Sequence, residues 1–240
     1  MEVTPYHTQD TKKEQVRTMF NSVAHKYDLL NKLLSFGIDK VWRRITINEL
    51  KKISPKSVLD IATGTADLAI AATAARPDKI VGVDISEGML EIGRKKIADR
   101  NLDRIISLQQ GDSEQLQFDD ASFDAVTVAF GVRNFQHLEK GLSEMQRVLK
   151  PGGKVFVLEF SKPTMFPVKQ FYGFYSRYIL PFIGKKISGD SAAYTYLPES
   201  VKHFPSGKAF GEVLQKCNFN SVVIKPLTFG IVTLYIAVKS

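Results

Sequence analysis

Acidic side chains flank a short loop that follows the first strand-like segment of the chain. The stretch SVLDIATGTADL (residues 57–68) has the pattern of a buried strand, a tight loop and a helix start. Asp60 and Asp67 lie on either side of Gly64, which permits close approach of a ligand to the backbone. Such carboxylates disfavour a pyrophosphate, the usual ligand of a helix N-terminus. The loop with Asp60 and Gly64 therefore predicts S-adenosyl-L-methionine, whose ammonium and sulfonium cations are attracted to acids.

Two further acids end the next two strand-like segments. Asp84 lies 20 residues after Gly64, a spacing that suits a carboxylate accepting from both ribose hydroxyls. The alternative for Asp84 is a helix N-cap, because the letters DIS begin the next helical segment. Asp112, with Ser113 beside it, would face the adenine amino group, although alone it would more often be a turn residue. Three acids in register favour the binding role.

Strand-like and helical segments alternate along most of the chain, which predicts an α/β fold with helices on both faces of a mostly parallel, doubly wound sheet. The last two strands are separated only by LTFG, too short for a crossover, so the last strand should run antiparallel. The predicted seven strands cover 57–61, 79–84, 105–110, 123–130, 154–160, 221–226 and 233–238, and the helices cover 66–76, 86–99, 136–149 and 206–217.

Two additions surround this α/β domain. Residues 1–52 are predicted to form an N-terminal helical cap, with a disordered start over 1–10 and a break at Gly37, and residues 53–240 the main domain. An insertion over 162–206 interrupts the alternation of strands and helices before the sixth strand. Its first part carries an aromatic stripe at helical spacing, and residues 187–207 are polar and rich in turn residues. The stripe consists of Phe171, Phe174, Tyr175, Tyr178, Ile179 and Phe182.

Composition excludes several classes of protein. The 240 residues contain no apolar run of about 18 or more, the N-terminus has no signal-peptide core, and the single Cys217 excludes an internal disulfide. The net charge of +8 is dispersed and does not by itself choose a partner. These features predict a cytoplasmic protein. No metal is expected, because the four histidines lack ligand spacing: His7, His25, His137 and His203.

The successive motifs resemble those of class I methyltransferases. They are VLDIATGTADLA, GVDISEGMLEIGRKK, GDSEQL, FDAVTVAFGVRNF and EMQRVLKPGGKVFVLEFSKP. With VRTMFNSVAHKYDLLNKLLSFGIDKVWR and TYLPESVKHFP, the chain from about Lys13 is similar to the ubiquinone/menaquinone biosynthesis C-methyltransferase family. The resemblance implies cofactor contacts at Thr65, Asp84, Asp112 and Ser113. Ala129 stands where the family often has serine, so a side-chain hydrogen bond is lost there.

The resemblance also implies a reaction, the C-methylation of a polyprenyl hydroquinone, converting demethylmenaquinol to menaquinol. Methylation of a benzoquinol in ubiquinone biosynthesis, or of another lipid or small phenol, stays open. FGVRN would lie at the end of the fourth strand, where a doubly wound fold presents residues to substrate. Arg133 would stabilise the phenolate, and Asn134 would hold the second ring oxygen. The alternative for Arg133 is an ion pair with a helix acid such as Glu139.

Partners follow from the same reasoning. The aromatic insertion would cover the quinol and its tail, and the alternative is ordinary core packing. With Lys169, Arg177, Lys185 and Lys186 beside it, the stripe suits peripheral contact with the inner face of the membrane. A homodimer is left open. A nucleic-acid methyltransferase is disfavoured because AFGVRNF replaces the Asn/Asp-Pro-Pro-aromatic motif that is usual in enzymes acting on amino groups. A non-catalytic binding module is disfavoured because the loop at Gly64 and its acidic residues are intact.

Overall fold

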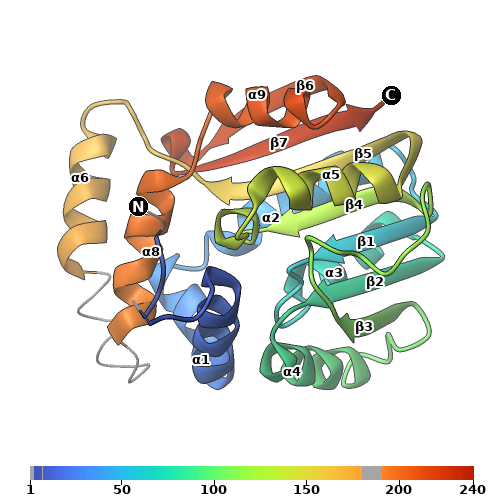
Figure 1. Ribbon diagram of the computed structural model, residues 1–240, viewed down its shortest axis with the longest axis horizontal. Helices are drawn as coiled ribbons and strands as arrows, with labels where there is room; N and C mark the ends of the chain where they lie inside the picture. The colour runs from blue at the N-terminus through green and yellow to red at the C-terminus, as the bar shows by residue number, and fades with distance from the viewer. Residues whose placement is uncertain (1–2, 7, 180–190) are drawn as a thin grey trace.

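A seven-stranded sheet forms the centre of the protein (Figure 1), in a computed structural model that describes residues 3–6, 8–179 and 191–240. The strand order is β3-β2-β1-β4-β5-β7-β6. β7 runs antiparallel to both its neighbours, and the other pairs are parallel. The predicted fold class is therefore confirmed. The strands are β1 Ser57–Ile61, β2 Lys79–Asp84, β3 Ile106–Gln110, β4 Phe123–Ala129, β5 Leu149–Phe160, β6 Phe219–Leu227 and β7 Val232–Lys239.

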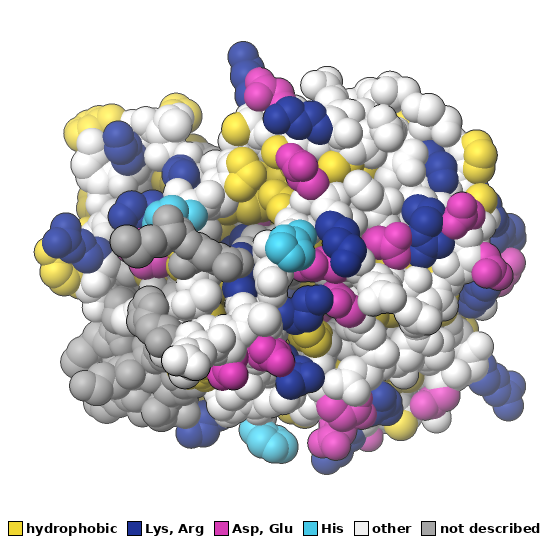
Figure 2. Space-filling model, viewed as in Figure 1, with side chains coloured by type: hydrophobic (Ala, Val, Ile, Leu, Met, Phe, Trp, Pro, Cys, Tyr) yellow, Lys and Arg dark blue, Asp and Glu magenta, His cyan; other side chains and the backbone are white. Residues whose placement is uncertain are grey.

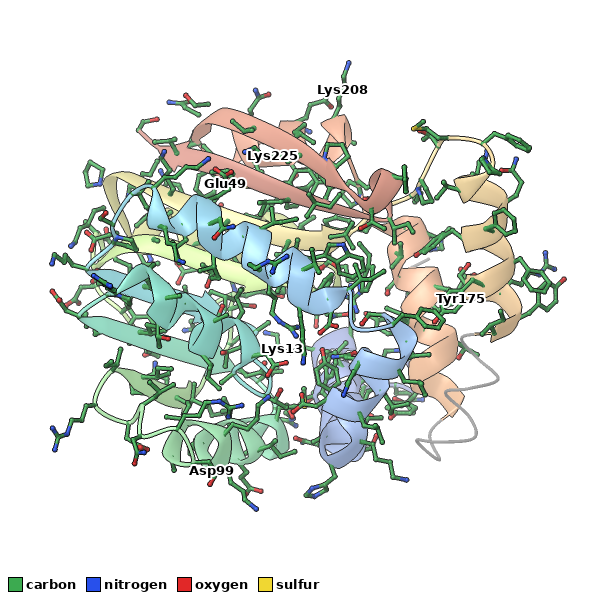
Figure 3. The ribbon with its side chains drawn as sticks, turned by 180° about the vertical axis from the view of Figure 1, so that it is seen from behind. Lys13, Glu49, Asp99, Tyr175, Lys208 and Lys225 are labelled. Carbon is green, nitrogen blue, oxygen red and sulfur yellow. The ribbon has the colours of Figure 1, made fainter. Side chains whose placement is uncertain are left out.

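Helices cover both faces of the sheet because its central strands are apolar on both sides. All five residues of β1 are buried, as expected for a parallel strand between two helical layers. One layer consists of α5 (Leu138–Val148) and α9 (Lys208–Lys216). The other consists of α2 (Asp39–Lys51), α3 (Asp67–Ala72) and α4 (Glu87–Ala98). Glu49 of α2 also forms a 2.8 Å ion pair with Lys225 of β6 (Figure 3).

β5 is longer than the predicted 154–160, because pairing with β4 begins at Leu149. Leu149 lies opposite Phe123, and the register then shifts before Ala125 pairs with Lys154. Gly152, at φ +76°, provides the turn-like backbone that the irregularity needs. The tripeptide Pro151–Gly153 therefore belongs to an irregular strand, whereas sequence patterns suggest a loop.

The long helix α1 (Lys12–Leu34) lies beside the carboxyl ends of the parallel strands. In Figure 1 the arrowheads of β1, β4 and β5 point to the side that holds α1 and α8 (Ser191–His203). A capping box between Thr11 and Glu14 begins α1. Gly37, at φ +75°, lies in the turn to α2, as predicted for a break at this glycine.

The insertion folds against α1 through a small apolar core of its own. α6 (Val168–Phe174) continues into a π-helical turn, η3 (Tyr175–Ile179), and Tyr196 of α8 packs on Val16, Met19 and Val23. The prediction of a turn-rich segment over 187–207 is wrong for 191–203, because burial of Tyr196 stabilises a helix there. Phe182 lies outside the described residues.

The prediction of a disordered start is also wrong for residues 3–6 and 8–10. Val3 and Tyr6 pack on the same apolar core as α1, and the Tyr6 N–H donates to Gln15 Oε1 at 2.9 Å. Among the helices of residues 3–6, 8–179 and 191–240, none is both long and apolar enough to cross a membrane.

Candidate active site

Two adjoining hollows lie between the strand ends and α1. We call the first the inner pocket; the ends of β1–β4 line it together with residues of α1 between Lys13 and Tyr27. The second, the outer cavity, has a volume of about 350 Å³ and lies between α1, α2, α6 and α8. Phe20, Tyr27 and Phe130 line both hollows and therefore mark the boundary between them.

Asp84 lines the inner pocket where the sequence predicts it. Its carboxylate accepts from the Gly64 N–H and from the Ser86 N–H, both at 2.8 Å. Burial raises the pKa of Asp84 to about 6, and the backbone donors oppose this rise. The alternative that Asp84 is the helix N-cap is wrong, because Ser86 caps α4. Asp84 thus fixes the loop glycine and faces the pocket at once.

Asp60 lies beneath the loop instead of flanking the pocket. Its oxygens accept from the hydroxyls of Thr63 and Thr127 at 2.6 Å each, and the side chain is fully buried. Burial, with a smaller effect from the charge of Asp84, raises the pKa of Asp60 to about 6. Asp67 is also turned away, onto Lys96 and Arg43. The direct contact expected of Asp60 is therefore replaced by a supporting role under the loop.

The side chain of Thr65 does not reach the inner pocket either. Its hydroxyl donates to Asp28 of α1 at 2.6 Å and accepts from Lys96 at 3.1 Å. Gly64 does line the pocket, and its N–H is already bound to Asp84. The cofactor contact that the resemblance implies for Thr65 is thus not available to its hydroxyl in this arrangement.

Asp112 and Ser113 line the opposite end of the inner pocket, at the end of β3. Lys13 of α1 reaches Asp112 Oδ2 at 2.5 Å and lies 3.9 Å from Glu114 Oε2. This ion pairing raises the pKa of Lys13. Lys13 was not predicted as a site residue, because it comes from a helix 99 residues earlier in the chain than Asp112. Figure 3 shows Lys13 between α1 and the strand ends.

α1 is held across the inner pocket at several points. Lys12 donates to the carbonyls of Arg133 and Phe135, and Asn21 accepts from the Ser86 hydroxyl at the start of α4. The free volume inside is about 70 Å³, whereas pockets for drug-sized ligands measure roughly 300–1,000 Å³. With α1 in this position the free volume of the inner pocket is below that range.

The outer cavity is mainly aromatic and aliphatic. The rings of Phe130 and Phe160 lie 4.5 Å apart, and the Trp42 ring lies 6.0 Å from Phe130 and 6.2 Å from Phe160. The Trp42 indole donates to the Thr228 hydroxyl at 2.7 Å, which fixes its plane. A flat, apolar ring fits this environment better than a sugar or a phosphate does.

Arg133 lines the outer cavity and is paired with a carboxylate that the sequence did not suggest. Arg133 Nη1 lies 2.9 Å from Glu159 Oε1, at the end of β5, and both side chains are buried. The partner is therefore Glu159 of the LEFSKP motif, and the suggested pairing with Glu139 is wrong. Burial raises the pKa of Glu159, against the opposing effect of Arg133. The two most specific motifs, FGVRN and LEFSKP, thus meet in one buried ion pair.

Asn134 does not share the cavity of its neighbour. Asn134 lines the inner pocket and is absent from the walls of the outer cavity. The two residues belong to a short 3₁₀ turn, Val132–Asn134, in which successive side chains point about 120° apart. The prediction that Asn134 holds a second ring oxygen of the substrate is therefore not supported by its position.

The aromatic stripe of the insertion is divided between two sides. Tyr175 of the stripe lines the outer cavity together with Tyr172, which is not part of the stripe, and the Tyr175 hydroxyl donates to the Leu34 carbonyl at 2.7 Å (Figure 3). Phe174 and Tyr178 are exposed, and Phe171 lines the cavity while it remains 72% exposed. The outer side is thus not covered by the described part of the chain, and core packing does not account for it.

The two hollows differ in whether their buried groups without a hydrogen-bond partner are donors or acceptors. Within the described residues, Asn134 Oδ1 and Glu114 Oε2 at the inner pocket are buried acceptors without a hydrogen-bond partner. Arg133 Nε at the outer cavity is a buried donor without one. A ligand that satisfies them would bring donors to the inner pocket and an acceptor to the outer cavity. Across residues 3–6, 8–179 and 191–240, no group of three or more His, Cys, Asp and Glu side chains could hold a metal ion.

Solved structures of low sequence identity share this fold. A SAM-dependent methyltransferase from Thermotoga maritima superposes with a TM-score of 0.64 at 19% identity, covering 93% of this chain and 99% of the other. A SAM-dependent methyltransferase from Aquifex aeolicus superposes with a TM-score of 0.62 at 18% identity, covering 92% and 98%. These likenesses show a class I methyltransferase fold.

Sequence relatives are much closer. Demethylmenaquinone methyltransferase of Bacteroides fragilis is 48% identical over 238 residues, 99% of this chain and 97% of the relative. The protein of the same name from Porphyromonas gingivalis is 44% identical, covering 99% and 98%. The ubiquinone/menaquinone biosynthesis C-methyltransferase UbiE of Geobacter sp. is 45% identical, covering 95% and 97%. The model of the ubiE/COQ5 methyltransferase family matches residues 8–239, and the chain belongs to that family.

Proposed function

We propose that the protein transfers a methyl group from S-adenosylmethionine to a ring carbon of a polyprenyl hydroquinone. The observation that carries the proposal is that buried acceptors lack a hydrogen-bond partner at the inner pocket, whereas a buried guanidinium donor lacks one at the outer cavity. Unpaired acceptors and acids line the inner pocket, which suits a cofactor that presents an ammonium, an amino group and hydroxyls. In the aromatic outer cavity, Arg133 Nε has no hydrogen-bond partner among the described residues, and a guanidinium donor there suits a ring that presents an ionising oxygen.

Demethylmenaquinol is the favoured substrate, because two of the relatives named above, from Bacteroides fragilis and Porphyromonas gingivalis, carry the name demethylmenaquinone methyltransferase. A benzoquinol of ubiquinone biosynthesis is the second candidate, from the UbiE relatives. The cofactor would supply an electrophilic methyl group when bound, with Asp84 at its ribose and Asp112 with Ser113 at its adenine. The protein's part is alignment of the ring, exclusion of water and stabilisation of the phenolate by Arg133.

The boundary between the hollows sets where transfer would occur. Phe20, Tyr27 and Phe130 line both sides, so the nucleophilic ring carbon and the methyl group would meet among them. Ionisation of the quinol would increase electron density at the adjacent ring carbon, the position to which the bound cofactor would supply its electrophilic methyl group. Loss of the proton from that carbon then restores the aromatic ring. The α1 cap over residues 1–52 and the insertion over 162–206 would together keep water from this point.

The purified protein is expected to add one methyl mass to demethylmenaquinol in the presence of S-adenosylmethionine, as read by mass spectrometry. Trp42 is the single tryptophan and lines the outer cavity. Reduced and oxidised naphthoquinones should therefore quench its fluorescence. A parallel reaction with a demethylated benzoquinol separates the two candidate substrates. Methylation of neither quinol by a protein that binds the cofactor would contradict the proposed substrate class.

Peripheral contact with a membrane would supply the lipid-dissolved substrate from the cytoplasmic side. The outer cavity reaches the surface between the α1–α2 turn and α6, where Phe36 and Phe171 line it and are 77% and 72% exposed. In Figure 2 hydrophobic side chains lie beside basic ones along the edge formed by α6. Lys169 and Arg177 are exposed there; Lys185 and Lys186 lie outside the described residues. Such a rim suits an anionic bilayer surface.

The protein is expected to float with anionic liposomes at low salt. The double variant Phe171→Ser, Phe174→Ser should reduce the bound fraction severalfold, because both substitutions remove exposed apolar area at the rim. Val223→Ser is the matched control, since Val223 is also exposed but lies on β6, at the far edge of the sheet. Flotation of the double variant equal to wild type would exclude α6 as the contact. Sedimentation of the same samples tests for a homodimer.

A further inference from the structure

We propose that Asn134 holds the amino-acid end of the cofactor, its side-chain oxygen accepting a hydrogen bond from the α-ammonium group. The inference rests on the proposed function, because it takes S-adenosylmethionine as the ligand of the inner pocket. It assigns Asn134 to cofactor binding and removes it from the quinol, where the sequence placed it.

The hydrogen bonds of the side chain distinguish its two polar atoms. Asn134 is 8% exposed and lines the inner pocket. Its Nδ2 donates to the Phe130 carbonyl at 3.4 Å, while Oδ1 is buried with no hydrogen-bond partner among the described residues. The reverse orientation of the amide would set its oxygen against the Phe130 carbonyl oxygen, which is repulsive. The unpaired oxygen is therefore available to accept a hydrogen bond from a ligand donor.

The order of the strands decides which part of the cofactor that donor belongs to. Along the strand ends, β3 carries Asp112, β2 carries Asp84, and then come β1 and β4. With adenine at β3 and ribose at β2, the amino-acid chain must extend towards β1 and β4. The loop that bears Asn134 begins directly after β4.

Other groups at the β4 end are engaged or unsuitable. Ala129 has no polar side-chain atom, and the Phe130 carbonyl already accepts from Arg133 and from Asn134. Gly131 lies so close to Ala62 that a Cβ there would be 2.6 Å from the Ala62 Cβ, so the wall is bare backbone. Glu114 Oε2, which also lacks a hydrogen-bond partner among the described residues, lies at the β3 end of the pocket, 3.9 Å from Lys13 Nζ.

A neutral amide also suits the charge of this part of the ligand. The amino-acid end carries a carboxylate directly beside the ammonium, so its net charge is near zero. A carboxylate in place of Asn134 would attract one group and repel the other at close range. An amide oxygen accepts from the ammonium without that repulsion.

The test compares three ligands that differ in the amino-acid end. S-adenosylmethionine and S-adenosylhomocysteine carry it, whereas 5′-methylthioadenosine has the adenine, ribose and thioether alone. Asn134→Leu is expected to weaken the first two at least about tenfold, the low end for a hydrogen bond to a charged group. Binding of 5′-methylthioadenosine should change less than about twofold on the same scale. Calorimetry gives the three affinities, and circular dichroism checks the fold.

The controls separate the possible outcomes. Asp84→Ala should weaken all three ligands, because Asp84 is assigned to the shared ribose. Equal weakening of all three by Asn134→Leu, or of none, would overturn the proposal. A raised KM for the quinol with unchanged cofactor affinity would return Asn134 to the substrate. If Asn134→Leu fails to fold, Asn134→Ser is measured on the same three ligands. Wild-type protein that binds none of them would contradict the proposed function instead.

Discussion

Replacing Asp84 with alanine is expected to lower the affinity for S-adenosylmethionine by about 10²-fold or more. Each hydrogen bond from a ribose hydroxyl to this carboxylate is worth about 1.5–3 kcal/mol, and two such bonds are expected. The variant also frees the Gly64 and Ser86 N–H groups that shape the loop. Calorimetry on the folded variant measures the loss. Asp112→Ala, in the same pocket, should cost less because Lys13 already shares that carboxylate. Wild-type affinity in Asp84→Ala would refute the ribose assignment.

The same carboxylate should make cofactor binding depend on pH. The pKa of Asp84 is raised from 3.8 to about 6 by burial, so the native state binds its proton more tightly than the unfolded state. Its contribution to stability is therefore fully present below about pH 4 and is lost as the pH rises through about 6. A ligand that hydrogen-bonds to the charged form offsets that loss. Affinity should thus increase between about pH 5 and pH 7.

Asp60→Asn provides the matched control for this pH dependence. The new amide can still bond to the hydroxyls of Thr63 and Thr127, but the substitution removes a buried charge near Asp84. The midpoint of the affinity change should then move to lower pH, while Asp84→Asn should abolish the change. Thermal shifts with and without cofactor, measured across the pH range, give both results. An unchanged profile in Asp84→Asn would assign the titration to another group.

The strand ends could be predicted from sequence because the pattern that makes them is local. β1 and β2 begin and end at the predicted residues, and Asp84 follows from its distance to Gly64. Asp60 shows the limit of the same reasoning. A residue at the end of a strand can point above or below the loop, and two threonine hydroxyls hold Asp60 below it.

Contacts between distant segments could not be predicted. Lys13 and Asp112 meet because α1 crosses the strand ends, and no local pattern in α1 indicates that path. Glu159 lies in a segment whose sequence is mostly apolar and predicts a buried strand. Its pairing with Arg133 arises because β4 and β5 are neighbours in the sheet, which the local sequence does not show. Arg133 and Asn134 are adjacent in sequence, yet a 3₁₀ turn directs them into different hollows.

The buried pair of Arg133 and Glu159 changes what a substitution of the arginine should do. Arg133→Ala leaves the fully buried Glu159 without its cation. Breaking one side of a buried ion pair costs about 3–5 kcal/mol, a large fraction of the stability of a domain. Low activity of this variant would therefore not separate a catalytic arginine from a structural one. Removal of both charges, in Arg133→Met with Glu159→Gln, is often close to neutral for stability.

The double variant should fold, bind the cofactor and still turn over about 10²–10³-fold more slowly. That factor is the usual cost of removing one donor to a developing oxyanion. Arg133 Nε, at the outer cavity, is a donor with no hydrogen-bond partner among the described residues. Because its contribution is larger in the transition state than in the bound substrate, kcat should fall more than KM rises. The deficit should shrink at higher pH, where more quinol ionises unaided.

Two comparisons complete the experiment. Arg147→Met with Glu144→Gln removes another guanidinium–carboxylate pair, held at 2.7 Å between residues of α5 that line neither hollow, and should leave kcat unchanged. Arg133→Lys keeps the charge beside Glu159 and should preserve the fold, but it should rescue the rate only in part, because an ammonium does not reproduce the planar fork of a guanidinium. Normal turnover by the folded Arg133→Met, Glu159→Gln protein would leave Arg133 with a purely structural role, as the partner that keeps Glu159 compensated at the end of β5.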